Sequence, residues 1–93
     1  MNVVELIKKK EGSVVDVRTV EEFQMGHVEE SVNLPMHEVP QRLDELKSMK
    51  KPLILICASG NRSGQVTQYL TGIGMEDVYN GGGWMEFMEI LES

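Results

Sequence analysis

The chain has 93 residues, 41% hydrophobic and 26% charged, which suffices for one hydrophobic core; we treat residues 1–93 as a single domain. Its net charge of −6 argues against a nucleic-acid partner, because nucleic acids are bound mainly by basic surfaces. The single cysteine, Cys57, excludes an internal disulfide, a C-x-x-C redox pair and a cysteine-built zinc site. The longest apolar run, residues 53–58, is too short for a bilayer, and the amino end lacks a signal-peptide pattern. We therefore expect a cytoplasmic protein with no membrane partner.

The first third of the chain predicts two short strands around a short helix. The β-branched run 14–17 is typical of a buried strand. Thr19 and Glu22 then have the spacing of a capping box, which begins a helix that ends at Gly26. This capping role is sufficient to explain Glu22. Residues 31–34 predict a second short strand before Pro35.

The remainder predicts three helices and two strands. Apolar side chains recur at helical spacing over residues 39–49, which predicts one helix with Pro40 in its first turn. Residues 53–56 are apolar at every position, as in a central parallel strand covered on both faces. A helix over about 66–73 and a brief strand over 77–79 follow. The glycines at 81–83 are then expected to turn the chain into a last helix.

This alternation predicts an α/β fold: a small, doubly wound, mostly parallel sheet of about four to five strands with helices on both faces. In such sheets ligands bind beyond the carboxyl ends of the strands. Cys57 lies at one of these ends, and Arg18 and Gly81 follow two others. We expect Asp16 and Arg18 to support this edge through an ion pair or hydrogen bonds rather than to contact substrate.

The residues after Cys57 are suited to holding a negative charge. Gly60 lets the backbone turn, and the small side chains of Ala58 and Ser59 allow successive N–H groups to point inward. A helix that begins near Ser63 adds further unpaired donors. Together with the Arg62 guanidinium, these groups are expected to lower the pKa of the Cys57 thiol and to favour the nucleophilic thiolate.

Three segments of the chain resemble rhodanese-type sulfurtransferases. Residues 57–63, Cys-Ala-Ser-Gly-Asn-Arg-Ser, are similar to the active-site loop of that family. The amino-terminal signature of the family is similar to Asp16-Val17-Arg18, followed by Glu22-Phe23, Gly26-His27-Val28 and the run 31–35. Residues 80–87 are similar to its glycine–aromatic motif, with Phe87 where a tryptophan is more usual. The resemblance spans residues 14–87 and implies a rhodanese-like domain.

The resemblance also implies a double-displacement reaction. Cys57 takes the outer sulfur of a small anionic donor such as thiosulfate, releases sulfite, and passes the sulfur to cyanide or a thiol. Arg62 would help to hold the donor, and no metal or organic cofactor is needed because the cysteine is the carrier. A protein could serve as sulfur donor or acceptor. The implied substrate-binding residues are Ala58, Ser59, Gly60, Asn61, Arg62 and Ser63.

Other functions remain open at this point. The chain could be a sulfur-relay or non-enzymatic binding module that docks to a protein, or a cysteine redox sensor. A cysteine-dependent phosphatase is disfavoured, because those loops hold five residues between cysteine and arginine and this loop holds four. Family members that use thiosulfate often carry a basic residue where this chain has Ala58, so the preferred donor is not fixed by the sequence.

Overall fold

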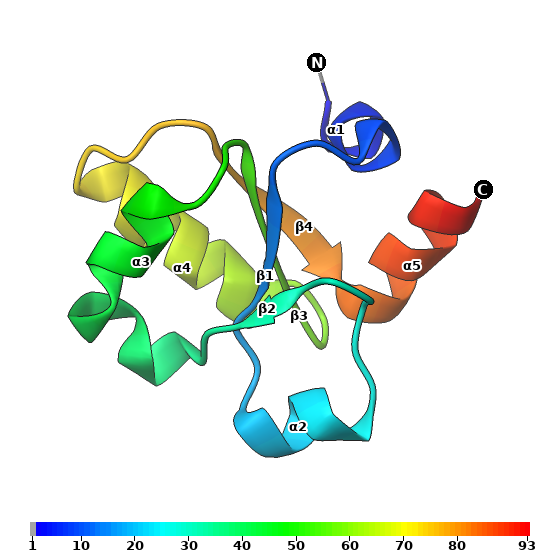
Figure 1. The fold of residues 1–93 in the computed structure, drawn as a ribbon, viewed down its shortest axis with the longest axis horizontal. Coiled ribbons are helices and arrows are strands. Elements are labelled where there is room, and N and C mark those ends of the chain that lie inside the picture. Colours follow the sequence, from blue (N-terminus) through cyan, green and yellow to red (C-terminus); the bar gives the residue numbers. More distant parts are fainter. Residues whose placement is uncertain (1) are drawn as a thin grey trace.

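A computed structural model describes residues 2–93 of the chain. Its sheet has four parallel strands in the order β2-β1-β3-β4, so that the predicted parallel α/β architecture is confirmed (Figure 1). The strands are β1 (Ser13–Asp16), β2 (Val32–Asn33), β3 (Leu53–Cys57) and β4 (Val78–Gly83).

Helices cover both faces of the sheet and its carboxyl end. In Figure 1, α3 and α4 lie on one side of the sheet, α1 and α5 lie on the other, and α2 lies beyond the carboxyl ends of the strands. The capping box predicted at Thr19 and Glu22 is present and begins α2. The helices are α1 (Val3–Lys9), α2 (Val20–Met25), the 3-10 helix η1 (Met36–Gln41), α3 (Leu43–Ser48), α4 (Asn61–Gly72) and α5 (Trp84–Glu92).

The central strand β3 separates two hydrophobic clusters. All five of its residues are buried, as the continuous apolar run predicted. Because side chains alternate along a strand, Leu53, Leu55 and Cys57 pack with η1, α3 and α4, whereas Ile54 and Ile56 pack with α1 and α5. Cys57 is therefore fixed between a covered sheet and the beginning of α4.

The single helix predicted over residues 39–49 is wrong. The segment forms η1, which contains Pro40, and then the separate helix α3. The proline ring has no N–H and disfavours a continuous α-helical ladder, and Arg42 between the two helices has φ −121° and ψ 28°. The Arg42 side chain bridges the junction through ion pairs with Glu38 (2.9 Å) and Glu45 (2.7 Å).

The glycines at 81–83 also differ from their predicted role as a turn. They belong to β4, where a register shift opposite Leu55 and Ile56 leaves Gly81 without a partner. A Cβ at Gly81 would lie 2.7 Å from Cγ2 of Ile54, so only glycine lets the two strands approach here. The bulge brings Gly83 beside Cys57.

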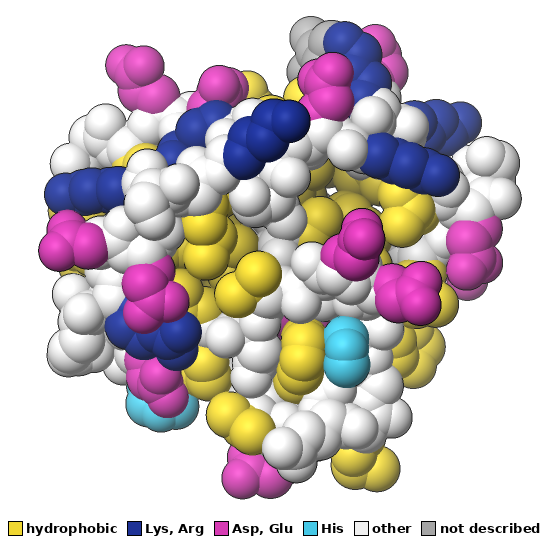
Figure 2. All heavy atoms as spheres, viewed as in Figure 1, with side chains coloured by type: hydrophobic (Ala, Val, Ile, Leu, Met, Phe, Trp, Pro, Cys, Tyr) yellow, Lys and Arg dark blue, Asp and Glu magenta, His cyan; other side chains and the backbone are white. Residues whose placement is uncertain are grey.

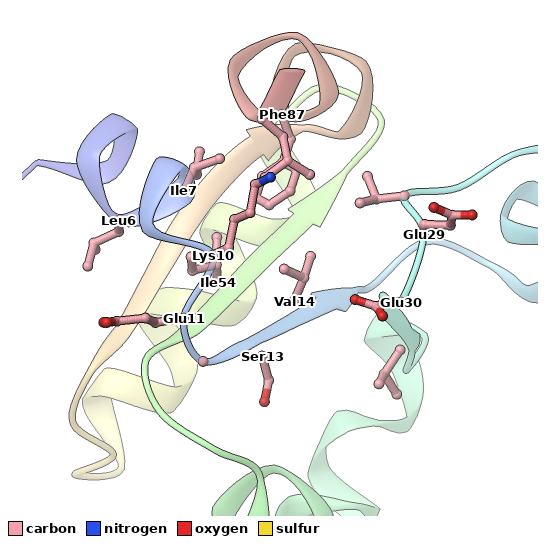
Figure 3. A pocket seen from close by; sticks show the side chains of 14 residues that line it. Leu6, Ile7, Lys10, Glu11, Ser13, Val14, Glu29, Glu30, Ile54 and Phe87 are labelled. Atoms are coloured by element: carbon pink, nitrogen blue, oxygen red, sulfur yellow. The ribbon is translucent and has the colours of Figure 1, made fainter. Parts of the chain in front are cut away.

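A cavity of about 400 Å³ lies away from the Cys57 loop (Figure 3). Leu6 and Ile7 from α1, Val14 from β1 and Phe87 from α5 contribute to its apolar lining, and Lys10 reaches across it. None of residues 57–63 contributes to its lining. Within residues 2–93, the helices are too short or too polar to cross a membrane.

Candidate active site

Cys57 ends β3 with its sulfur atom surrounded by hydrogen-bond donors. The Gly60 N–H donates to Sγ at 3.0 Å, and the Ser63 N–H and hydroxyl lie 3.4 Å from it. Gly60 has φ +96°, and its left-handed conformation turns the loop so that its N–H faces the sulfur. The predicted ring of inward-facing donors is thus present at Gly60 and Ser63, at the beginning of α4.

These donors determine the direction of the Cys57 pKa shift. Burial alone raises the pKa of the thiol, but hydrogen bonds from the Ser63 side chain and from the backbone of Ser63, Ser59 and Gly60 outweigh it. The net pKa is lowered, as expected, so the thiolate is favoured. The main causes that lower it are hydrogen bonds to sulfur, as the predicted ring of donors implied, whereas the charge interaction between Arg62 and Cys57 is a minor cause of the raised pKa of Arg62.

The Arg62 guanidinium is bound to a carboxylate from a distant part of the chain. Its Nη1 and Nη2 donate to Oε1 and Oε2 of Glu22 at 2.8 and 3.0 Å. This pair raises the pKa of Arg62, and the hydrogen bond from Arg62 is the main cause that lowers the pKa of Glu22 to about 2. The interpretation of Glu22 as only a capping residue is therefore wrong: it caps α2 and also holds Arg62.

Asp16 and Arg18 form the ion pair that was expected of them. Nη2 of Arg18 lies 2.8 Å from Oδ2 of Asp16, and both side chains are buried. Arg18 also donates to the carbonyl oxygens of Gly26 (2.7 Å) and Glu22 (3.3 Å), and it lies over the Trp84 ring. The pair thereby connects β1 with both ends of α2 and with the beginning of α5.

Asn80 supports the loop, although the sequence did not indicate it. Its side-chain N–H donates to the Gly60 carbonyl at 3.0 Å, and its Oδ1 lies 2.7 Å from the Ser63 hydroxyl, whose single proton is shared between this oxygen and the Cys57 sulfur. Oδ1 also accepts from the Gly82 N–H at 3.0 Å, across the β4 bulge. The only signal in the sequence is the position of Asn80 directly before the glycine run.

The other loop residues lie on the surface. Ala58, Ser59 and Asn61 are exposed, whereas Cys57 has 0% exposure. The side-chain Oδ1 of Asn61 accepts from Nε2 of Gln65 at 3.1 Å, on the exposed side of α4. Among residues 2–93, no cluster of three or more His, Cys, Asp and Glu side chains is placed to hold a metal ion. The arrangement therefore offers one buried sulfur atom whose negative charge is stabilised by hydrogen-bond donors.

The fold and the loop define a class of α/β protein that holds a cysteine among main-chain amides at the carboxyl end of a parallel sheet. The model of the rhodanese-like domain family matches residues 2–90, and the chain belongs to this family.

Named relatives agree with this assignment. The thiosulfate sulfurtransferase GlpE of Pseudomonas savastanoi pv. phaseolicola is 37% identical over 79 residues, which cover 84% of this chain and 74% of that protein. A rhodanese-related protein from Thermoplasma volcanium has a TM-score of 0.77 and 32% identity, over 96% of this chain and 89% of that one. The structure of a rhodanese with anions from E. coli has a TM-score of 0.72 and 31% identity, over 80% of this chain and 88% of that one. Family and relatives together support a sulfurtransferase activity.

Proposed function

We propose that the chain is a sulfurtransferase that carries sulfane sulfur on Cys57. The observation that carries the proposal is the set of donors on Sγ, with the Gly60 N–H at 3.0 Å and two Ser63 groups at 3.4 Å. Hydrogen bonds to an ionised sulfur favour the thiolate, which is the nucleophilic form of cysteine. The similarity to a protein named thiosulfate sulfurtransferase supports this class of reaction.

In the first half-reaction the Cys57 thiolate attacks the outer sulfur atom of the donor, for which thiosulfate is the reference. A bond forms between the two sulfur atoms, the S–S bond of thiosulfate breaks, and sulfite leaves with the electron pair. The terminal sulfur of the resulting persulfide carries the negative charge. Main-chain N–H groups of the loop 58–63 would stabilise this charge, beginning with those of Gly60 and Ser63 that already contact the Cys57 sulfur.

In the second half-reaction cyanide or a thiolate attacks the terminal sulfur. The persulfide S–S bond breaks, and its electron pair returns to Cys57 as the thiolate. The products are thiocyanate or a new persulfide on the acceptor. Every electron pair in the cycle belongs to a sulfur atom or to the acceptor, so the reaction uses no external oxidant or reductant and no cofactor.

The sulfur atom is covered, although the residues that follow it are exposed. Cys57 has 0% exposure, so a donor sulfur reaches Sγ only when the groups around it make room. The exposed Ala58 and Ser59 have small side chains, which leave room for a donor or for the cysteine of a protein partner. Asp16 and Arg18 would support the site without touching the donor.

Intact-mass measurement tests the proposal directly. We expect the protein to gain the mass of one sulfur atom with thiosulfate and to lose it again with cyanide. The control variant Cys57→Ser should gain none. If thiosulfate, mercaptopyruvate and a low-molecular-weight persulfide all fail to load the wild-type protein, sulfur transfer is excluded, and a binding module or a phosphatase becomes the better hypothesis.

A further inference from the structure

The carboxyl edge of the sheet has no unpaired Lys or Arg side chain, although the proposed donor is an anion. All nine Lys and Arg residues belong to the described part of the chain, residues 2–93. The six lysines lie in or after helices that directly precede β1 or β3, and therefore near the amino ends of the strands. They are Lys8, Lys9, Lys10, Lys47, Lys50 and Lys51. On the face shown in Figure 2 most of the dark-blue Lys and Arg side chains accordingly gather in the upper half, away from α2.

Each of the three arginines is paired with a carboxylate. Arg18 binds Asp16 and is buried, so it cannot reach a donor without breaking a buried pair. Arg42 binds Glu38 and Glu45 at the junction of η1 and α3. Arg62 alone lies in the Cys57 loop, and both of its terminal nitrogens donate to Glu22. The one cation available to a donor therefore already has an anionic partner.

The Glu22 carboxylate is held in this position from two sides. The Thr19 N–H and hydroxyl donate to its Oε1 at 3.0 and 3.1 Å, and Arg62 binds both of its oxygens. Glu22 and Arg62 side chains keep about a third of their surface exposed, at 36% and 33%, so an ion in solution reaches the pair. A dianion that approaches Arg62 meets the fixed negative charge of Glu22 at the same place.

We propose that Glu22 is a specificity-determining residue: by occupying the Arg62 guanidinium it disfavours dianionic sulfur donors and shifts the preference of Cys57 towards donors of lower negative charge. The inference rests on the proposed sulfur transfer and adds the charge class of the donor to it. Ala58 acts in the same direction, because it places no charge beside the sulfur. Glu22 acts through Arg62 and takes no part in bond breaking.

The variant Glu22→Gln tests this with little change of structure. Glutamine also serves as the third residue of a capping box, so α2 keeps its first turn while the charge is removed. The two donors are thiosulfate, a dianion that releases sulfite, and benzenethiosulfonate, a monoanion that releases benzenesulfinate. We expect Glu22→Gln to raise kcat/KM for thiosulfate about fivefold at low salt, and that for benzenethiosulfonate by less than half as much.

Two controls show whether Glu22 affects donor preference through its ion pair with Arg62. Glu21→Gln removes a neighbouring exposed charge on the same turn and should leave the ratio of the two kcat/KM values within about twofold of wild type. When Arg62→Gln is already present, adding Glu22→Gln should change the ratio of the two kcat/KM values by no more than Glu21→Gln does. Equal gains from Glu21→Gln and Glu22→Gln would overturn the proposal, because they would show a general charge effect.

Salt dependence of the wild-type protein provides a test without substitution. If Glu22 repels the dianion, rising NaCl concentration should raise the thiosulfate rate relative to the benzenethiosulfonate rate. A falling ratio would show that a net positive field attracts the donor and would overturn the proposal. If neither donor loads sulfur on Cys57, and mercaptopyruvate and a low-molecular-weight persulfide also fail, the proposed function fails. If both donors load it and Glu22→Gln leaves the ratio of the two kcat/KM values unchanged, only the role of Glu22 fails.

Discussion

The buried pair of Asp16 and Arg18 makes a quantitative prediction for stability. Asp16 is 0% exposed, and its carboxylate accepts from the Arg18 main-chain N–H, from Nε and from Nη2 at 2.8–3.0 Å. The substitution Asp16→Ala removes all of these acceptors and leaves the guanidinium buried. Two carbonyl oxygens, of Gly26 and Glu22, remain as its partners. Removal of one partner from a buried ion pair costs about 3–5 kcal/mol, because a buried charge loses its compensation.

This loss is a large share of the total free energy of unfolding. A domain of 93 residues has a free energy of unfolding of about 5–14 kcal/mol, from about 0.05–0.15 kcal/mol per residue. In urea, with a slope of about 2 kcal/mol per molar, a loss of 4 kcal/mol lowers the unfolding midpoint by about 2 M. Far-UV circular dichroism follows the helices, and the fluorescence of the single tryptophan, Trp84, follows the environment of Arg18.

Two further variants test the cause of the loss. Asp16→Ala/Arg18→Met removes both charges and should be more stable than Asp16→Ala alone, because no unpaired charge is left buried. Asp44→Ala, at an exposed position of α3, should change the free energy of unfolding by no more than about 0.5 kcal/mol. A loss below about 1 kcal/mol for Asp16→Ala, which is the size found for exposed pairs, would refute the reasoning.

Four further predictions concern the loop. Gly60→Ala should slow sulfur loading and cost about 1–2 kcal/mol of stability in urea unfolding, because φ is +96° and the new Cβ would lie 3.1 Å from the Gly82 Cα; unchanged loading would contradict this. The rate of Cys57 alkylation should rise with pH around a midpoint below that of a free thiol, since its pKa is lowered and the thiolate reacts. Ser63→Ala should raise the midpoint of this pH dependence, because the thiolate loses the hydrogen bond from the Ser63 hydroxyl; an equal or lower midpoint would contradict that role. Asn80→Ala should slow sulfur loading, measured by intact mass over time, because the Gly60 carbonyl loses its donor; wild-type loading would show that this support is dispensable.

The pairing of Glu22 with Arg62 makes a small contribution to stability that depends on pH. The pKa of Glu22 is lowered from 4.5 to about 2, so this contribution is fully present above the ordinary carboxyl range and is lost progressively as the pH falls from that range through about 2. Across neutral pH the carboxylate therefore stays charged, and the proposed discrimination against dianions does not change with pH. The exposed side chains of Glu22 and Arg62 limit the stability contribution to that of a surface pair.

The sequence by itself determined the features that depend on neighbouring residues. The continuous apolar run of β3, the capping box at Thr19 and the glycine turn after Cys57 are patterns a few residues long, and the structure contains each of them. The parallel α/β architecture followed from the alternation of such patterns. The direction of the Cys57 pKa also followed, because donors at a helix beginning come from adjacent residues.

Only the tertiary structure decided which groups meet across the sheet edge. Glu22 lies 40 residues from Arg62, and Asn80 lies 17 residues from Ser63; no local pattern relates either pair. The register shift that places the glycines in β4 depends on the fit of that strand against Ile54, and the break at Arg42 depends on how η1 and α3 each pack on the core. Such contacts are set by the crossovers that bring distant segments together, because side-chain pairing across a fold carries no short-range signature in the chain.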